Sequence, residues 1–221
     1  VKLASASWCK PPARYPCARP GVVGDACRKS LRPALAGGRP ANAIPEEAGG
    51  IEGLLVPSYS RKCQKRLACL HAGLIGMAQT CVYLTSPYFS PGTVVHRALQ
   101  DAEHRGVDVR LLVPRRSDPL VAGWATRAAY AQFLSAGVRV YEYLPRQLHA
   151  KTSVVDAGWS IVGSANLDYR SLFINQELVL FAPDRVLAGQ LQAQHLQDFR
   201  MPAKSLFGLG IPAAGARVVS S

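Results

Sequence analysis

Acidic residues are scarce in this sequence of 221 residues: 14 Asp and Glu stand against 26 Lys and Arg, a formal net charge of +12. Only 18% of the residues are charged and 48% are hydrophobic, which excludes an acidic disordered tail and a coiled coil. The positive excess favours an anionic partner such as nucleic acid, an acidic membrane surface or a phosphate-bearing substrate. The length suits one domain with a hydrophobic core.

Two other patterns are absent. None of the six cysteines forms a C-x-x-C pair, and no histidine follows at a zinc-finger interval, so we expect no metal site and reduced, incidental thiols. The apolar stretch 67–84 is interrupted by His71, Gln79 and Thr80. A single membrane span is therefore not expected there.

The charge and the helix-breaking residues are concentrated at the start of the chain. Residues 1–66 have a net charge of +8, and seven prolines and two Gly-Gly pairs within residues 1–53 interrupt any helical or strand period. We expect residues 1–66 to be a disordered or poorly structured basic leader. Residues 67–200 are expected to fold as one domain, and residues 201–221 form an uninformative tail.

Short apolar runs separated by Gly, Pro and Asp predict alternating helices and strands in the folded part. The expected strands are 81–85, 107–113, 138–143, 148–155, 159–163 and 174–181. The expected helices are 67–79, 92–105, 118–136 and 183–199. The order strand, helix, strand implies βαβ units, and the hairpin turn at 156–158 adds antiparallel strands. The sequence predicts an α/β fold, an αβα sandwich with a mixed sheet.

The most informative segment contains His149, Lys151 and Asp156 in the spacing H-x-K-x4-D. In a strand, His149 and Lys151 project from the same face. An imidazole beside an ammonium suits a phosphate, since one group can attack phosphorus while the other holds the oxygens. Asp156 should face away or cap the hairpin turn, which gives it a supporting role.

Three polar residues downstream extend this pattern. Ser164 and Asn166 lie two apart in Gly-Ser-x-Asn and offer neutral hydrogen-bond donors to phosphate oxygens. Glu177 lies in a strand that is otherwise apolar. A buried carboxylate beside a histidine would fix its tautomer and stabilise the imidazolium.

His149-x-Lys151-x4-Asp156 followed by Gly-Ser-x-Asn resembles the HKD motif of the phospholipase D superfamily. Three stretches are similar to bacterial cardiolipin synthases: Tyr83–Phe89, Gly106–Asp118 and Gly163–Ser171. The resemblance covers roughly residues 72–199 and corresponds to the C-terminal catalytic half of such enzymes. Residues 1–66 share none of it.

The resemblance implies a mechanism in which two HKD motifs meet across a pseudo-twofold axis. One histidine attacks phosphorus to give a phosphohistidine, the other protonates the leaving alkoxide, and an alcohol or water then releases the phosphatidyl group. No metal or other cofactor is required. Carried over, His149 is nucleophile or general acid, Lys151 and Asn166 bind phosphate with help from Ser164, Glu177 orients the imidazole, and Asp156 supports the motif.

One departure from the family pattern is that only one motif is present. None of His71, His96, His104 and His195 begins an H-x-K, so the chain supplies half a site. A C2 homodimer could complete it, as in single-motif nucleases of the superfamily. We favour the alternative, that the chain is a truncated gene product.

The expected function is therefore phosphatidyl transfer of the cardiolipin synthase type. The expected partner is an anionic, phosphatidylglycerol-like phospholipid, met by peripheral contact with the inner membrane from the bacterial cytoplasm. Two alternatives stay open: a catalytically inactive remnant, and a single-motif phosphodiesterase or nuclease acting as a homodimer, with nucleic acid the less favoured substrate.

Overall fold

A computed structural model describes residues 50–58, 61–115, 130, 133–145, 147–200 and 203–205. The strands are β1 (Leu54–Pro57), β2 (Cys81–Thr85), β3 (Phe89–Ser90), β4 (Asp108–Pro114), β5 (Arg139–Tyr143), β6 (Thr152–Val155), β7 (Trp159–Gly163), β8 (Leu167–Asp168), β9 (Leu178–Ala182) and β10 (Ala203–Ser205). The helices are α2 (Arg61–Met77), α3 (Thr93–His104), α5 (Tyr169–Phe173) and α6 (Arg185–Arg200).

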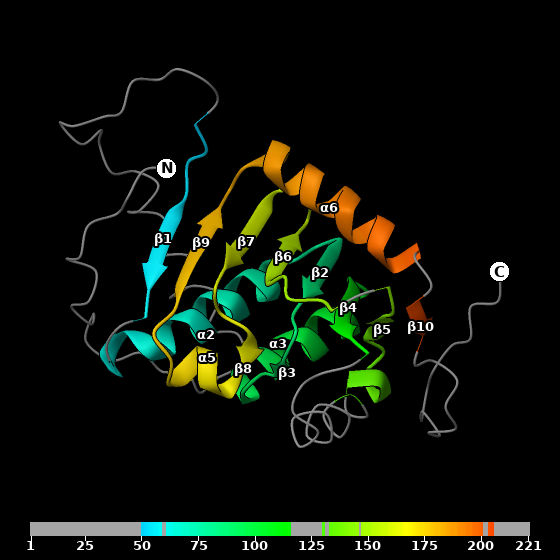
Figure 1. The fold of residues 1–221 in the computed structure, drawn as a ribbon, viewed down its shortest axis with the longest axis horizontal. Coiled ribbons are helices and arrows are strands. Elements are labelled where there is room, and N and C mark those ends of the chain that lie inside the picture. Colours follow the sequence, from blue (N-terminus) through cyan, green and yellow to red (C-terminus); the bar gives the residue numbers. More distant parts are fainter. Residues whose placement is uncertain are drawn as a thin grey trace.

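Within the described residues, eight strands form one mixed sheet in the order β1-β9-β7-β6-β2-β4-β5-β10 (Figure 1). The pairs β2–β4 and β4–β5 are parallel, as the βαβ pattern of the sequence predicts. The remaining pairs are antiparallel, and β6–β7 is the expected hairpin. The fold is α/β with a mixed sheet, which confirms the expected fold class.

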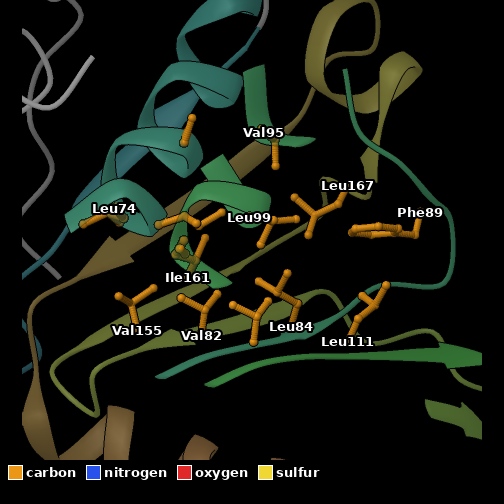
Figure 2. Packing of buried hydrophobic residues seen from close by; sticks show 14 of the residues in the cluster. Leu74, Val82, Leu84, Phe89, Val95, Leu99, Leu111, Val155, Ile161 and Leu167 are labelled. Carbon is orange, nitrogen blue, oxygen red and sulfur yellow. The ribbon is translucent and has the colours of Figure 1, made fainter. Parts of the chain in front are cut away.

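Helices cover both faces of this sheet. Helices α2 and α3 pack on one face, and α6 lies across the other (Figure 1). Between α2, α3 and the sheet lies the main hydrophobic core, where Leu74 and Leu99 meet Val82, Leu84 and other strand residues (Figure 2). A smaller cluster, which includes Tyr83, Leu112 and Phe199, faces α6.

Strand β2 lies in the middle of the sheet, and its five residues are all buried. Val82 and Leu84 point to the main core, whereas Cys81 and Tyr83 belong to the cluster beneath α6. An unbroken apolar run is what a strand covered on both faces requires. The expectation of a doubly covered strand at 81–85 is therefore confirmed.

The boundaries of the fold differ from those expected at both ends of the chain. Strand β1 pairs with β9 and helix α2 begins at Arg61, so parts of residues 1–66 belong to the domain rather than to a leader. Strand β10, in the expected tail, pairs with β5. Sequence periodicity misses both, because β1 and β10 are only four and three residues long.

Other expectations fall outside what the structure describes. Residues 1–49 and 206–221 are not among the described residues, and neither is most of the helix expected at 118–136. Among the helices of the described ranges, none is long and apolar enough to cross a membrane.

Two buried histidines lie on opposite sides of the sheet. His71 of α2 donates from Nδ1 to the Leu67 carbonyl oxygen at 2.8 Å and packs against the ring of Phe181. His195 of α6 contacts the hydroxyls of Thr85 and Thr152, each at 3.2 Å from a ring nitrogen. Burial lowers the pKa of each imidazole to about 4, so both are neutral at pH 7.

We expect these two histidines to make the fold acid-sensitive. Their folded-state pKa lies below the ordinary 6.5, so the unfolded chain binds protons that the folded chain excludes. Above pH 6.5 these histidines should leave the free energy of unfolding unchanged. As the pH drops from 6.5 towards 4, each histidine should lower the free energy of unfolding by up to about 1.4 kcal/mol for every pH unit. Urea unfolding across this range measures the slope.

The variant His195→Gln should reduce that slope, even if it is less stable at neutral pH. Exposed His104 provides the matched control, and His104→Gln should retain the wild-type slope. Equal slopes for His195→Gln and wild type would contradict the assignment.

Candidate functional site

His149 and Lys151 lie in an extended segment immediately before β6, which begins only at Thr152 rather than at residue 148. His149 is exposed and Lys151 is half-buried. The Lys151 Nζ lies 3.3 Å from both ring nitrogens of His149 and donates to the His149 carbonyl oxygen at 2.9 Å. The structure therefore brings an imidazole and an ammonium together at the surface, as the spacing predicted.

Burial and two carboxylates act on the charge of Lys151 in opposite directions. Burial lowers the pKa of Lys151, and the negative charges of Glu177 and Asp168 offset this only in part. These carboxylates come from β8 and from the segment before β9, so three parts of the chain converge on one ammonium. A half-buried ammonium of this kind is suited to an incoming anion such as phosphate.

The end of β7 brings Ser164 to the same place. The Gly163 N–H donates to the Lys151 carbonyl oxygen at 3.4 Å, and Ser164 exchanges two 3.0 Å hydrogen bonds with the backbone of Leu178. A Cβ at Gly163 would collide with the Leu178 carbonyl oxygen and lie 2.7 Å from the Cα of Val179. Glycine is thus required here because two backbones approach closely.

Glu177 precedes β9 and is half-buried, not fully buried as its apolar surroundings predicted. Its Oε2 accepts from the Ser164 hydroxyl at 2.5 Å and its Oε1 from the Asn175 side chain at 3.3 Å. No hydrogen bond joins Glu177 to His149 in the part of the chain described. The Glu177 carboxylate acts on Lys151 through its negative charge. A contact that would orient the imidazole of His149 is not seen among the described residues.

Asn166 follows Ser164 by two residues and is half-buried. Its Oδ1 is buried and has no hydrogen-bond partner among the described residues. The chain next to it is fixed, because the Leu167 N–H donates to the Ser86 hydroxyl at 3.0 Å and Asp168 caps α5 by accepting from Ser171 N–H at 2.7 Å. The amide therefore lies beside hydrogen-bonded neighbours, and its oxygen has spare capacity to accept a hydrogen bond.

Asp156 lies at the other end of the four-residue strand β6 from Lys151, five residue steps or about 16 Å of extended chain away. Its carboxylate accepts from the N–H groups of Gln79, Thr80 and Cys81 and from the Thr80 hydroxyl, at 2.8–3.1 Å. The structure does not bring Asp156 together with the other candidates. It joins the β6–β7 hairpin to the start of β2 and faces away from His149 and Lys151, as one of the two expected placements, and its carboxylate bonds to residues 79–81 rather than to the hairpin turn.

The assembled groups suit phosphodiester chemistry. An exposed imidazole can act as nucleophile or acid, an ammonium can bind oxygens, and a carboxylate can balance charge. The one proton of the Ser164 hydroxyl is donated to Glu177 in this structure. No cluster of three or more His, Cys, Asp or Glu that could hold a metal ion occurs among the residues with described positions.

Sequence reasoning missed three residues that shape this site: Ser58, Asp168 and Asn175. Asn175 lies two residues before Glu177, a spacing that could have drawn attention to it. Asp168 caps α5, and its charge also reaches Lys151. No local pattern distinguishes Ser58.

Comparisons with known proteins agree with this geometry. A family model described as "Cardiolipin synthase, PLD-like domain" matches residues 72–199. Cardiolipin synthase A of Citrobacter koseri is 39% identical over 127 residues, which are 56% of this chain and 26% of that protein. The chain thus spans about a quarter of the length of that relative.

Solved structures show the same fold. Nuc, a phospholipase D family member from Salmonella typhimurium, aligns with a TM-score of 0.61 and 20% identity over 71% of this chain and 98% of its own. NucT from Helicobacter pylori aligns with a TM-score of 0.55 and 15% identity over 67% and 96%. At these identities the likeness concerns the fold alone.

We expect Asp156→Asn to reduce stability. Burial alone would raise the pKa of Asp156, but the N–H groups of residues 79–81 outweigh it and hold the pKa below the ordinary 3.8. Replacing a carboxylate that accepts these bonds should lower the free energy of unfolding by about 1–3 kcal/mol at neutral pH. Urea unfolding of variant and wild type measures this difference.

The difference should shrink as the pH falls through the folded-state pKa of Asp156, because its contribution needs the charged form. The exposed carboxylate of Asp101 serves as control, and Asp101→Asn should unfold like wild type. A full-sized difference that persists in strong acid would refute the role of the charge.

Proposed function

Because the chain belongs to the phospholipase D-like domain family of cardiolipin synthases, we propose that it forms one half of a phosphodiester-transfer site with His149 as its nucleophile. The observation that carries this proposal is the exposed imidazole of His149 with the Lys151 ammonium 3.3 Å from its ring nitrogens. Ser164, Asn166 and Glu177 complete the half-site.

The proposed reaction has two steps. A ring nitrogen of His149 attacks phosphorus, a P–N bond forms, the P–O bond to the leaving alkoxide breaks, and a second histidine gives that alkoxide its proton. A hydroxyl oxygen of an alcohol, or of water, then attacks phosphorus as the P–N bond breaks, and its proton returns to the second histidine. Lys151 and Asn166 hold the phosphate oxygens, with help from Ser164.

The second histidine must come from outside this half-site. The sequence has one H-x-K, and the chain corresponds to about a quarter of its Citrobacter relative. A second copy of the chain in a C2 dimer would supply an identical His149. The alternative is an inactive form that binds phosphate without turning it over.

The substrate that we propose is an anionic phospholipid resembling phosphatidylglycerol, met at the inner membrane from the bacterial cytoplasm. The net charge of +12 supports attraction to an anionic surface. The elements next to the half-site also expose large apolar side chains: Tyr169 by 59%, Ile174 by 55% and Leu178 by 47%. Exposed aromatic and aliphatic groups are compatible with contact to lipid.

The experiment tests His149 as nucleophile without requiring the second histidine as general acid. A bis(nitrophenyl) phosphodiester has a leaving group that needs no proton, so a single half-site should release one nitrophenolate per chain and retain the phosphoryl group on His149. Mass spectrometry at alkaline pH, where a P–N bond survives, locates the adduct. His149→Ala should give neither product nor adduct, and exposed His104→Ala should behave like wild type.

Phosphatidylglycerol vesicles test the complete reaction. We expect cardiolipin only from a preparation that is dimeric by light scattering, and none from monomer. DNA cleavage without phosphatidyl transfer would instead support the single-motif phosphodiesterase. An adduct on another residue, or no adduct from the activated diester, would refute His149 as nucleophile.

A further inference from the structure

Ser58 lies just after β1, outside residues 72–199 that match the family, and is fully buried. Its N–H donates to the Glu177 carbonyl oxygen at 2.8 Å. Its hydroxyl donates to the Asn175 carbonyl oxygen at 3.0 Å and accepts from the Glu177 N–H at 3.0 Å. One serine thus makes three hydrogen bonds to the three-residue segment that contains Glu177.

The reason for this arrangement is the shape of residues 175–177. They link α5 to β9, and ladder pairing of β1 with β9 ends at Pro57 opposite Leu178. Beyond that point the Asn175 N–H donates to the Arg170 carbonyl oxygen and the Glu177 carbonyl oxygen accepts from the Ser58 N–H. The Asn175 carbonyl and the Glu177 N–H are left without a backbone partner, and buried backbone groups must be paired. The Ser58 hydroxyl, both donor and acceptor, pairs one group of each residue.

Two side chains hold the Glu177 carboxylate, one of them from the segment 175–177. Asn175 donates to one carboxylate oxygen and Ser164 to the other. Asn175 can do so only while the turn keeps its side chain beside Glu177, and Ser58 holds that turn together with the bond from the Asn175 N–H to the Arg170 carbonyl oxygen. The fixed carboxylate in turn acts on the ammonium of Lys151, together with Asp168.

We propose that Ser58 is a positioning residue for the Glu177 carboxylate, so that the segment 54–58 is part of the functional half-site. The inference rests on the proposed function only where it assigns Lys151 to the phosphate. Ser58 holds the turn at 175–177, and that turn places the Glu177 carboxylate whose charge acts on Lys151.

Loss of the hydroxyl should weaken this link. In Ser58→Ala the Asn175 carbonyl and the Glu177 N–H lose their partner, the turn relaxes, and the carboxylate spends less time near Lys151. Because Glu177 raises the pKa of Lys151, that pKa should fall in the variant. The fall should have the same direction as in Glu177→Gln and be smaller.

The experiment is an NMR titration of the Lys151 side chain in the full chain, which needs no catalytic activity. Ser58→Thr keeps a hydroxyl and should restore the wild-type titration. Ser160→Ala is the matched control, since Ser160 is equally buried and its hydroxyl has no hydrogen-bond partner among the described residues. It should titrate like wild type.

Ser58→Cys replaces the hydroxyl with a somewhat larger thiol, which is a weak hydrogen-bonding group, and tests the link if the alanine variant does not fold. It should lower the pKa of Lys151 as Ser58→Ala does. Both variants should also differ from wild type in their affinity for inorganic phosphate, which a ³¹P NMR titration measures. A Lys151 titration in both variants that superimposes on wild type overturns the inference.

The two proposals fail separately. A wild-type protein that forms no adduct but shows the Lys151 shift in Ser58→Ala refutes the function and keeps the positioning role. A wild-type protein that forms the adduct, with no Lys151 shift in Ser58→Ala, keeps the function and refutes the positioning role.

Discussion

The candidate site depends on the close approach of β7 and β9 at Gly163. Because this residue has no Cβ, its backbone lies against the Leu178 carbonyl oxygen, and Ser164 can bond to both the Leu178 backbone and the Glu177 carboxylate. On the other side of β7, Gly163 bonds to the Lys151 backbone. A larger residue would separate the strands and with them the hydroxyl, the carboxylate and the ammonium, since the interior tolerates little overpacking.

The residues of one short motif lie at two different ends of β6. His149 and Lys151 precede β6 and stay accessible, whereas Asp156 follows β6 and binds three backbone N–H groups at the start of β2. A carboxylate with these partners is held charged by structure and is unavailable for proton transfer at the distant imidazole. The four residues between Lys151 and Asp156 form β6, so the strand separates the proposed reactive groups at one end from the hairpin anchor at the other.

Much of the fold was predictable from residue patterns, because burial imposes period 2 on strands and period 3.6 on helices. The apolar run 81–85, the helix near 92–105 and the strand 159–163 were all predicted within a residue or two. Strands β1, β3, β8 and β10 were missed, since elements of two to four residues are too short to show a period. The extent of β6 was also overestimated, because pairing with β2 and β7 begins only at Thr152.

The sequence by itself determined which chemical groups the site contains, since the types and spacing of His149, Lys151, Ser164, Asn166 and Glu177 are local properties. Only the tertiary structure decided which of them meet. Glu177 bonds to Ser164 and acts on the charge of Lys151, whereas Asp156 bonds to the start of β2. It also added Ser58, whose hydroxyl bonds to a residue 119 positions away. Hydrogen bonds of this range arise from strand order and register, and no local period encodes them.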